Sequence, residues 1–353
     1  MEIRKYRIKR ESDLIPLKDL WNALETGEDM TTFQTWEWHR LLLKEWLGWK
    51  LHSLYSRCFV YAAIDGDTPL MLLPVIEYQF TTKTKWFGCQ KGLYLMGEGS
   101  YSDYMNAIYR SFRPEVFEAL CRKLKKDFHG LPFCLSSVRE DSQLSAYLTE
   151  KQVQREEETV SVSVKRRGSP EEYLASLSSK TRSNLRQALK RINRDGISYQ
   201  VEIRGRIQDQ QLLENMVAIH VKRMLVKNTK DSGWLHIMSS HVRKAYRKHR
   251  DLHNNIVAMS MRENEHSCVA LIWMNGKLAG YEYGLREEHA IRLLQTCFDD
   301  EFRFYSPGFR GIYDFIVQCY EDESIREFDF LRGDEPYKFQ LGGEQIMLYR
   351  YVI

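Results

Sequence analysis

Short apolar runs and one helical pattern follow one another in the first half of the chain. Strands are expected at 59–64 and 70–76, because both runs are apolar and the sequence Asp-Gly-Asp-Thr-Pro between them favours a tight turn. A helical spacing of apolar residues at 114–127 then leads into a further apolar run at 131–135. The pattern predicts an antiparallel hairpin followed by a helix and a strand.

The second half of the chain repeats this order of elements. Its hairpin is expected around the turn Asn275–Gly276, and a strand, a helix and a last strand follow it. These elements are expected at 269–274, 278–285, 291–298, 308–320 and 326–330. The repeat predicts a mixed α/β (α+β) chain built from two similar domains, 1–165 and 166–353. The alternative is that a hairpin and a helix recur by chance, as they can in any α/β protein.

Length and charge agree with a globular protein of two domains. A chain of 353 residues exceeds what a single hydrophobic core usually serves. Its 52 basic residues are nearly matched by 48 acidic ones, so the net charge of +4 predicts no general attraction for nucleic acid. The longest apolar runs are far shorter than the roughly 20 residues of a membrane-spanning helix, and no transmembrane segment is expected.

The seven cysteines predict neither a metal site nor a disulfide framework. The two nearest in sequence, Cys121 and Cys134, are thirteen residues apart, so the chain contains no Cys-x-x-Cys pair that could bind zinc. The count is odd, and most of the cysteines lie in apolar runs, where a cysteine is usually a small core residue. We therefore expect no metal and a reducing, cytoplasmic setting.

A loop crowded with charge follows the last predicted strand. Residues 329–338 read Asp-Phe-Leu-Arg-Gly-Asp-Glu-Pro-Tyr-Lys. This sequence resembles the Asp-Phe-x-x-Gly-Asp-x-x-Tyr-Lys signature of GNAT-superfamily acyltransferases of the cellulose-biosynthesis acetyltransferase type, which are relatives of the Fem peptidyltransferases. The resemblance implies tandem GNAT-like domains, with the acyltransferase unit in the second half and acetyl-coenzyme A as its donor.

The charged loop supplies candidates for the groups that acyl transfer needs, namely a base for the acceptor, donors for the oxyanion and an acid for the leaving thiolate. Asp334 is the candidate base or acceptor contact, Tyr337 the proton donor, and Lys338 a phosphate or oxyanion contact. Asp329 and Arg332 are expected to pair with each other and hold the turn, and Arg332 is also a candidate substrate contact. The alternative is a loop that only pairs its own charges.

The segment before the helix expected at 308–320 is the candidate donor site. GNAT enzymes hold the donor pyrophosphate on backbone amides where a strand ends and a helix begins. Residues 303–308 read Arg-Phe-Tyr-Ser-Pro-Gly, which departs from the superfamily's Arg/Gln-x-x-Gly-x-Gly pattern at the serine. The candidate cofactor-binding residues are Arg303, Ser306, Gly308, Arg310 and Gly311. The alternative is a plain helix cap, with Ser306 at the N-cap and Pro307 in the first turn.

A basic helix is a further candidate binding feature. The sequence Ser-Pro-Glu-Glu, starting at Ser169, opens a helix that then turns basic. Arg182 and Arg186 belong to a stripe that meets no acid before Asp195. This stripe predicts either a phosphate-binding surface or a solvated helix face.

Two shorter features complete the candidate substrate-binding residues. His220 and Arg223 share one face of a predicted helix, and the alternative for a lone histidine there is a structural role. Ser102, Asp103 and Tyr104 are expected either to reach the cleft between the domains or to form a capped turn.

Together with the resemblance, these residues predict an acyltransferase that moves an acyl group from acetyl-coenzyme A to an amine or hydroxyl of a saccharide or cell-envelope precursor. One alternative is a Fem-like transferase that uses aminoacyl-tRNA, which the basic helix would favour. Apart from a charged tRNA, no nucleic-acid partner is expected. The other alternative is a catalytically degenerate nucleotide-binding or scaffold protein of polysaccharide biosynthesis, which the departure at Ser306 and Pro307 would favour.

Overall fold

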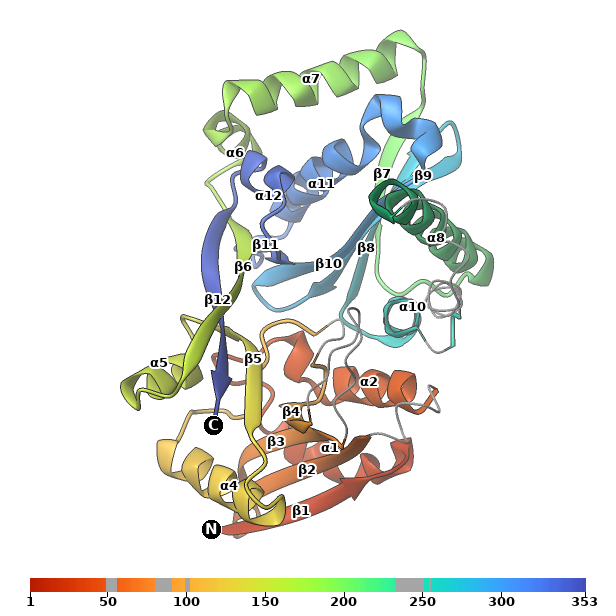
Figure 1. Cartoon of the computed structure of the whole chain (residues 1–353). Coiled ribbons are helices and arrows are strands. Elements are labelled where there is room, and N and C mark those ends of the chain that lie inside the picture. The colour runs from red at the N-terminus through yellow and green to blue at the C-terminus, as the bar shows by residue number, and fades with distance from the viewer. Residues whose placement is uncertain (49–55, 80–90, 99–101, 233–250, 254) are drawn as a thin grey trace. The chain divides into compact units, whose positions relative to one another are not determined.

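The computed structural model describes residues 1–48, 56–79, 91–98, 102–232, 251–253 and 255–353. These residues form two compact units (Figure 1). Unit 1 comprises Met1–Val160 together with Ile346–Ile353, and unit 2 comprises Ser161–Gln345. The chain leaves unit 1 along strand β6 (Arg155–Lys165) and returns to it along strand β12 (Glu344–Val352). Each unit combines a sheet with helices, which confirms the predicted mixed α/β fold class.

The sheet of unit 1 has the strand order β1-β2-β3-β4-β5-β12. Neighbouring strands are antiparallel except for β4 and β5, which run parallel. The strands before β6 are β1 (Glu2–Ile8), β2 (Ser56–Asp65), β3 (Thr68–Tyr78), β4 (Gly92–Leu95) and β5 (Phe133–Arg139). Strands β2 and β3 form the hairpin that the sequence predicts, and Gly66 takes the left-handed φ of 59° at its turn.

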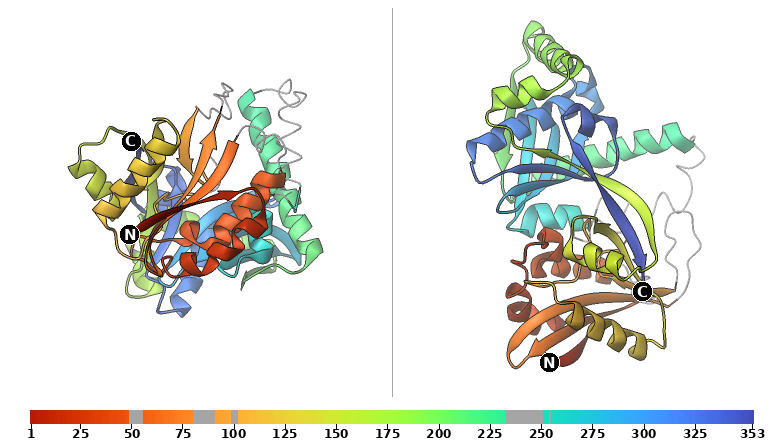
Figure 2. Two further views of the ribbon diagram at one scale, coloured as in Figure 1. Left: turned by 90° about the horizontal axis from the view of Figure 1, so that it is seen from below. Right: turned by 90° about the vertical axis from the view of Figure 1, so that its left-hand side faces the viewer.

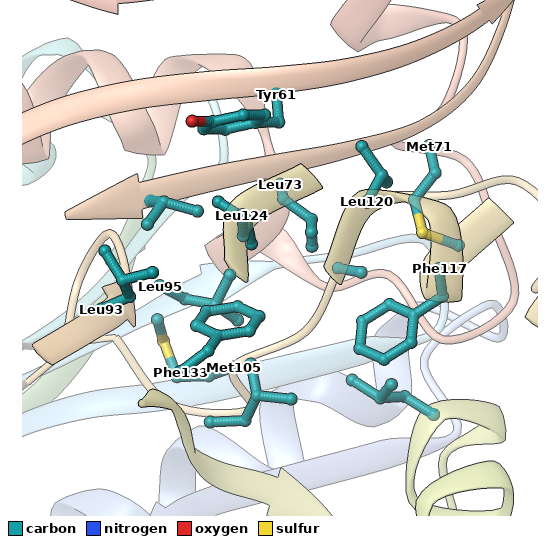
Figure 3. Close-up of a cluster of buried hydrophobic side chains, with 14 of the residues drawn as sticks. Tyr61, Met71, Leu73, Leu93, Leu95, Met105, Phe117, Leu120, Leu124 and Phe133 are labelled. Atoms are coloured by element: carbon teal, nitrogen blue, oxygen red, sulfur yellow. The ribbon is translucent and has the colours of Figure 1, made fainter. Parts of the chain in front are cut away.

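Helices cover both faces of the unit 1 sheet (Figures 1 and 2). They are α1 (Lys18–Asn22), α2 (Trp36–Gly48), α4 (Pro114–Asp127) and α5 (Gln143–Glu150). Because successive strand residues point to opposite faces, Val60 of β2 lies in one core with Trp21 of α1. Its neighbour Tyr61 lies in the other core with Leu120 of α4, and Figure 3 shows this second cluster. Two hydrophobic cores therefore hold unit 1 together.

The sheet of unit 2 has the strand order β6-β11-β10-β9-β8-β7. Strands β10 and β11 are parallel, and the other neighbours are antiparallel. The strands after β6 are β7 (Tyr199–Arg204), β8 (Ser267–Met274), β9 (Lys277–Arg286), β10 (Ala290–Phe298) and β11 (Glu327–Arg332). The predicted Asn-Gly hairpin is confirmed, because Asn275 and Gly276 both have positive φ, as a primed two-residue turn requires.

Helices also cover both faces of the unit 2 sheet. They are α6 (Pro170–Ser176), α7 (Ser179–Arg194), α8 (Gln210–Ser232), α10 (Ile256–Glu263), α11 (Pro307–Gln318) and α12 (Pro336–Gln340), with the 3-10 helix η5 (Asp300–Tyr305) before α11. Tyr283 of β9 donates a hydrogen bond to Ser260 of α10 at 2.6 Å. Its neighbour Glu282 points to the opposite face, towards Gly311 of α11. One face of β9 therefore faces α10, and the opposite face faces α11.

The basic helix predicted from Ser169 is in fact two helices. Ser169 caps α6 as predicted, accepting a hydrogen bond from the Glu172 amide at 3.2 Å. Leu177 is extended, with ψ 153°, and Ser178 then caps α7 by accepting from the Thr181 amide at 3.1 Å. The second serine cap offers the chain a new helix start, which is why the helix breaks here.

Among the described helices, none is long and apolar enough to cross a membrane. All six cysteines in the described ranges are free, and Cys89 lies outside those ranges. The same residues contain no group of His, Cys, Asp or Glu arranged to hold a metal ion.

Candidate active site

Strands β10 and β11 part from each other in the sheet of unit 2. Their parallel register runs for three residue pairs and ends at Arg292 and Asp329. β10 nevertheless continues to Phe298 and β11 to Arg332. The strands therefore diverge, and we call the gap between them the splay. Strand-to-strand hydrogen bonding stops at this gap, so backbone groups along it can serve an inserted ligand.

A buried ion-pair network marks the point where the two strands part. Arg292 is 6% exposed and donates to Asp329, which is 1% exposed. Arg292 also lies 2.9 Å from Glu287 and 3.9 Å from Glu327. Burial acts to raise the pKa of Glu327, but Arg292 and further partners leave that pKa below its usual range. Asp329 is thus held by Arg292 of the next strand, and its expected pairing with Arg332 stays a prediction.

Leu331 bends β11 at the edge of the splay. Its φ of 58° lies in the left-handed region, which costs a residue with a Cβ atom about 1–3 kcal/mol. The amide of Leu331 donates to Asp329 at 2.7 Å, and its carbonyl accepts from Lys338 at 3.2 Å. Two side chains of the charged motif therefore hold this bend, and the register between β11 and β6 shifts at the same place.

Lys338 is buried, and its ammonium group is fully engaged. The side chain is 2% exposed and donates to three backbone carbonyls, those of Leu331, Arg332 at 2.7 Å and Gly333 at 3.1 Å. Glu335 lies 2.9 Å from the same nitrogen. Because an ammonium group has three protons, none is left for a phosphate or an oxyanion. This geometry gives Lys338 a structural role in place of the predicted ligand contact.

Tyr337 and Asp334 keep their polar groups available. The half-buried ring of Tyr337 packs edge-on against Phe330, with 5.8 Å between the ring centres. Burial, followed by the charges of Glu282 and Glu335, raises the pKa of Tyr337, so the phenol stays protonated at neutral pH. Asp334 is exposed. Within the described part of the chain, neither the Tyr337 hydroxyl nor the Asp334 carboxylate makes a hydrogen bond.

Glu282 is a buried carboxyl group in β9. It is 0% exposed, and neither carboxyl oxygen has a hydrogen-bond partner among the described residues. Thr296 of β10 lies opposite it in the register, and a Cβ atom at Gly311 of α11 would lie 3.6 Å from its Oε1. Burial raises the pKa of Glu282 well above its usual range, although Thr296 and Arg223 act to lower it.

The first turn of α11 presents unpaired amides. Ser306 occupies the N-cap position with φ 55°, and Pro307 follows in the first turn, as the cap interpretation predicts. The Ser306 side chain does not cap the helix, and the amides of Gly308 and Phe309 have no partner in the described ranges. A Cβ atom at Gly308 would lie 2.8 Å from the Phe298 ring at the end of β10. The helix start therefore offers two amides and the positive end of its dipole beside β10.

The other predicted cofactor residues differ in what they can offer. Arg303 is exposed and lies 3.8 Å from Asp300. Arg310 is tied by two hydrogen bonds, of 2.8 and 2.6 Å, to Asp314 of the same helix, which leaves its guanidinium engaged inside the protein. A side chain at Gly311 would collide with β8, so this glycine permits the close approach of α11 to the sheet.

Residues of α8 reach the part of β10 that borders the splay. The guanidinium of Arg223 lies 3.7 Å from the ring centre of Phe298. The His220 Nε2 atom lies 3.5 Å from the side-chain amide of Gln295, and both residues line a small pocket together with Tyr281. The structure thus brings His220 and Arg223 next to β10, beyond the point where it leaves β11.

The basic stripe of α7 divides into engaged and exposed residues. Arg182 donates through Nη1 to the carbonyls of Ala175 and Leu177 and so closes the end of α6, while its predicted contact with the substrate stays a prediction. Arg186 is exposed and forms no ion pair with any described residue. Lys180 and Lys190 are exposed in the same way. The three exposed cations form what we call the basic face of α7.

The run from Ser102 to Tyr104 is buried in unit 1. Ser102 accepts a hydrogen bond from the Trp38 indole at 2.7 Å, and the Tyr104 carbonyl accepts from Gln34 at 2.8 Å. Asp103 between them is 6% exposed. These contacts hold the Ser102 hydroxyl and the Tyr104 backbone within unit 1, and the expected role of the run in substrate binding stays a prediction.

The sequence of unit 2 matches a known protein family. Residues 179–339 match the family described as the acetyltransferase (GNAT) domain. This part of the chain is a GNAT acetyltransferase domain. The protein is therefore an acyltransferase enzyme, as the sequence analysis predicted. The GNAT domain begins at α7 and ends in α12, so it contains the splay, Glu282 and the start of α11. Among curated protein sequences, none matches the chain.

Solved structures share the fold over nearly the whole chain. A conserved protein of unknown function from Bacteroides thetaiotaomicron is 13% identical, with a TM-score of 0.58 and 99% of each chain covered. FemX is 13% identical, with a TM-score of 0.52, and the match covers 100% of this chain and 98% of FemX. L-PGS from Bacillus licheniformis is 12% identical, with a TM-score of 0.52 and coverage of 94% and 90%. At these identities the likeness concerns the fold of the GNAT domain and of unit 1.

The sequence analysis did not single out Arg292 or Glu282. Each is a lone charge inside an apolar strand, in the sequences Ala-Ile-Arg-Leu-Leu and Gly-Tyr-Glu-Tyr-Gly. A charge in a buried strand must find a partner or become neutral, because an unpaired buried charge is costly. That signal was available in the sequence of the GNAT domain, and it points to both residues.

Proposed function

We propose that the GNAT domain transfers the acyl group of acetyl-coenzyme A to an amine or hydroxyl of a saccharide or cell-envelope precursor. The observation that carries this proposal is the splay, with the unpaired amides of Gly308 and Phe309 at its β10 side. Parted strands offer backbone groups to the extended arm of a thioester, as a sheet edge does to a peptide. The start of α11 attracts a diphosphate. The acceptor class follows from the resemblance of the motif at 329–338 to the cellulose-biosynthesis type.

In the proposed reaction, the acceptor attacks the thioester carbonyl and the carbon–sulfur bond breaks. Tyr337 gives its hydroxyl proton to the departing thiolate, and its raised pKa means that the phenol carries this proton when the donor binds. Asp334 accepts the proton of the acceptor or orients it by a hydrogen bond. Of the three loop residues predicted to be catalytic, these two retain that role in the proposal, and Lys338 instead supports the bend at Leu331.

A cytoplasmic role in polysaccharide biosynthesis completes this proposal. The free state of the described cysteines supports a reducing compartment, and the motif at 329–338 supports the pathway.

An aminoacyl-tRNA is the second candidate donor, and the basic face of α7 favours it. Lys180, Arg186 and Lys190 are exposed and carry no ion pair with described residues, so phosphates can reach them. Their helix lies beside η5, since Arg191 donates to the Phe304 carbonyl at 3.0 Å. The fold likeness to FemX agrees with this alternative.

Calorimetric titration with coenzyme A, acetyl-coenzyme A and charged tRNA tests the donor. Binding of the two coenzyme A species, with thiol release from acetyl-coenzyme A when acceptors are added, is the expected result. Binding of charged tRNA alone, weakening steeply with added salt, would replace the proposal by the second candidate. No binding in any titration would contradict both and leave the degenerate nucleotide-binding or scaffold protein.

Gly308→Asp is expected to weaken coenzyme A binding at least tenfold more than Gly308→Ala. Both substitutions add a Cβ atom against the Phe298 ring, at 2.8 Å from its Cδ1 in the present structure. Only the aspartate adds a negative charge at the start of α11, where it repels the diphosphate and occupies the amides itself. The two dissociation constants are measured by calorimetry, and melting temperatures show that both variants fold. Equal affinities would remove this helix start from the donor site.

A further inference from the structure

Helix α7 of the GNAT domain presents a basic side to solvent. Its sequence contains six Lys or Arg residues and no Asp or Glu. Leu185 and Ile192 are buried. Arg186, Lys190 and Arg194 recur every four residues on the opposite side, and all three are exposed. Because the apolar side of α7 is already buried, the side that a partner can reach is the basic one (Figure 1).

Little of this positive charge is neutralised within the protein. Lys180, Arg186 and Lys190, the basic face of α7, form no ion pair with any residue that the structure describes. Arg194 does have a partner, since it donates to Asp195 at 2.7 and 3.0 Å. At the usual rise of an α-helix, the row of cations from Lys180 to Arg194 is about 20 Å long. A row of this length matches an extended, negatively charged surface better than a single small anion.

An exposed aromatic side chain lies beside the cations. Phe304 of η5 is 53% exposed, which is unusual for so large an apolar group. The centre of its ring lies 5.0 Å from the guanidinium of Arg191 and 5.7 Å from that of Arg194. The interfacial region of a bilayer takes up apolar rings next to basic side chains, whereas the phosphates of an RNA gain nothing from such a ring. Cations with an exposed ring among them therefore favour a lipid surface over a nucleic acid.

We propose that the basic face of α7, together with Arg194 and Phe304, docks the GNAT domain on a membrane surface rich in anionic lipid. The cations contact lipid phosphates, and Phe304 enters the interfacial region of the bilayer. Docking places the domain beside acceptors that are anchored in a membrane. The inference goes beyond the proposed function and does not depend on the donor. Because the same face favours aminoacyl-tRNA as the second candidate donor, binding of tRNA is the competing outcome.

Sedimentation with lipid vesicles tests the proposal. The protein should bind vesicles made of equal parts of phosphatidylglycerol and phosphatidylcholine, should not bind phosphatidylcholine alone, and should bind more weakly as salt is added. A triple variant, Lys180→Gln with Arg186→Gln and Lys190→Gln, should bind the mixed vesicles about 100-fold more weakly, since each cation near an anionic surface contributes about fivefold. Phe304→Ser should weaken binding about tenfold and leave the salt dependence unchanged, because it removes apolar area and no charge.

Lys9→Gln with Lys125→Gln and Lys126→Gln is the matched control, because it removes the same charge from exposed lysines of unit 1 and should bind like the wild type. Melting temperatures show that all variants fold. Equal binding of the α7 triple variant and the wild type would overturn the proposal, as would a wild type that ignores the mixed vesicles. A wild type that binds tRNA through these three cations, but no vesicles, would assign the face to nucleic acid instead. The vesicle assay contains no acetyl-coenzyme A, so failure of the proposed function leaves its outcome unaffected.

Discussion

Tyr337→Phe is expected to lower the turnover number about 100-fold and to leave the melting temperature almost unchanged. Removing a general acid usually costs at least this factor. Phenylalanine keeps the ring that packs against Phe330 at 5.8 Å, and the lost hydroxyl makes no hydrogen bond with any described residue. The fold therefore loses little, while the leaving thiolate loses its proton donor. Thiol release from acetyl-coenzyme A gives kcat, and a thermal melt gives the stability.

Tyr313→Phe provides the control for Tyr337. This tyrosine also lies in the GNAT domain, but it stacks on Tyr173 between α11 and α6, so its hydroxyl should not affect turnover. Asp334→Asn in the same assay tests the proposed base, and its loss should appear in kcat and not in the melting temperature. Tyr337→Phe with nearly full turnover would show that the thiolate is protonated by another group.

Arg292→Met is expected to reduce the free energy of unfolding by about 3–5 kcal/mol at pH 7. The substitution fills much of the same space but leaves Asp329 buried without its cation, and this is the usual cost of breaking a buried pair from one side. Glu287 and Glu327 lose the same partner. Urea denaturation of the two proteins measures the difference.

The pH dependence of Arg292→Met identifies the carboxylates that cause the loss. The pKa of Glu327 is below its ordinary value of 4.5 in the folded protein, so its pairing contributes stability above that pH and loses it as the pH falls through the folded pKa. The difference between wild type and variant should narrow below pH 4.5. Arg286→Met removes an arginine whose side chain is 50% exposed and whose partner is Asp322, so it should cost less than about 1 kcal/mol. Equal losses for the two arginines would contradict the special role of Arg292.

Local rules account for the parts of the fold that the sequence analysis predicted correctly. The hairpin at Asn275 and Gly276 depends on a positive φ at two adjacent residues, which Asn and Gly accept readily. The start of α6 depends on the serine cap at Ser169. Each of these features is decided by residues adjacent in sequence. The break at Leu177 was missed because Ser178 starts a second helix by the same local rule, inside what had the pattern of one helix.

The loop at 329–338 shows what local sequence patterns could not predict. The motif at 329–338 contains Asp329, Leu331 and Lys338, which form the bend beside the splay. The motif did not reveal the role of each of its side chains, because the role of a charged side chain depends on the groups to which it hydrogen-bonds in the fold. Lys338 donates all three protons of its ammonium group to carbonyls of its own loop. Arg182 and Arg310 also donate to groups within the domain, and no pattern of spacing reveals that.

The sequence by itself determined that this protein is a mixed α/β acyltransferase with its chemistry in the second half, because periodicity, turn residues and a short motif are all properties of neighbouring residues. Only the tertiary structure decided that Arg292 is the partner of Asp329, and that Glu282 lies without one beneath α11. Arg292 and Glu282 both lie in strands inside the sheet of unit 2. Contacts between segments that are distant in sequence therefore set their burial and pairing. Burial and pairing determine whether a carboxyl group is a salt-bridge partner or a neutral acid.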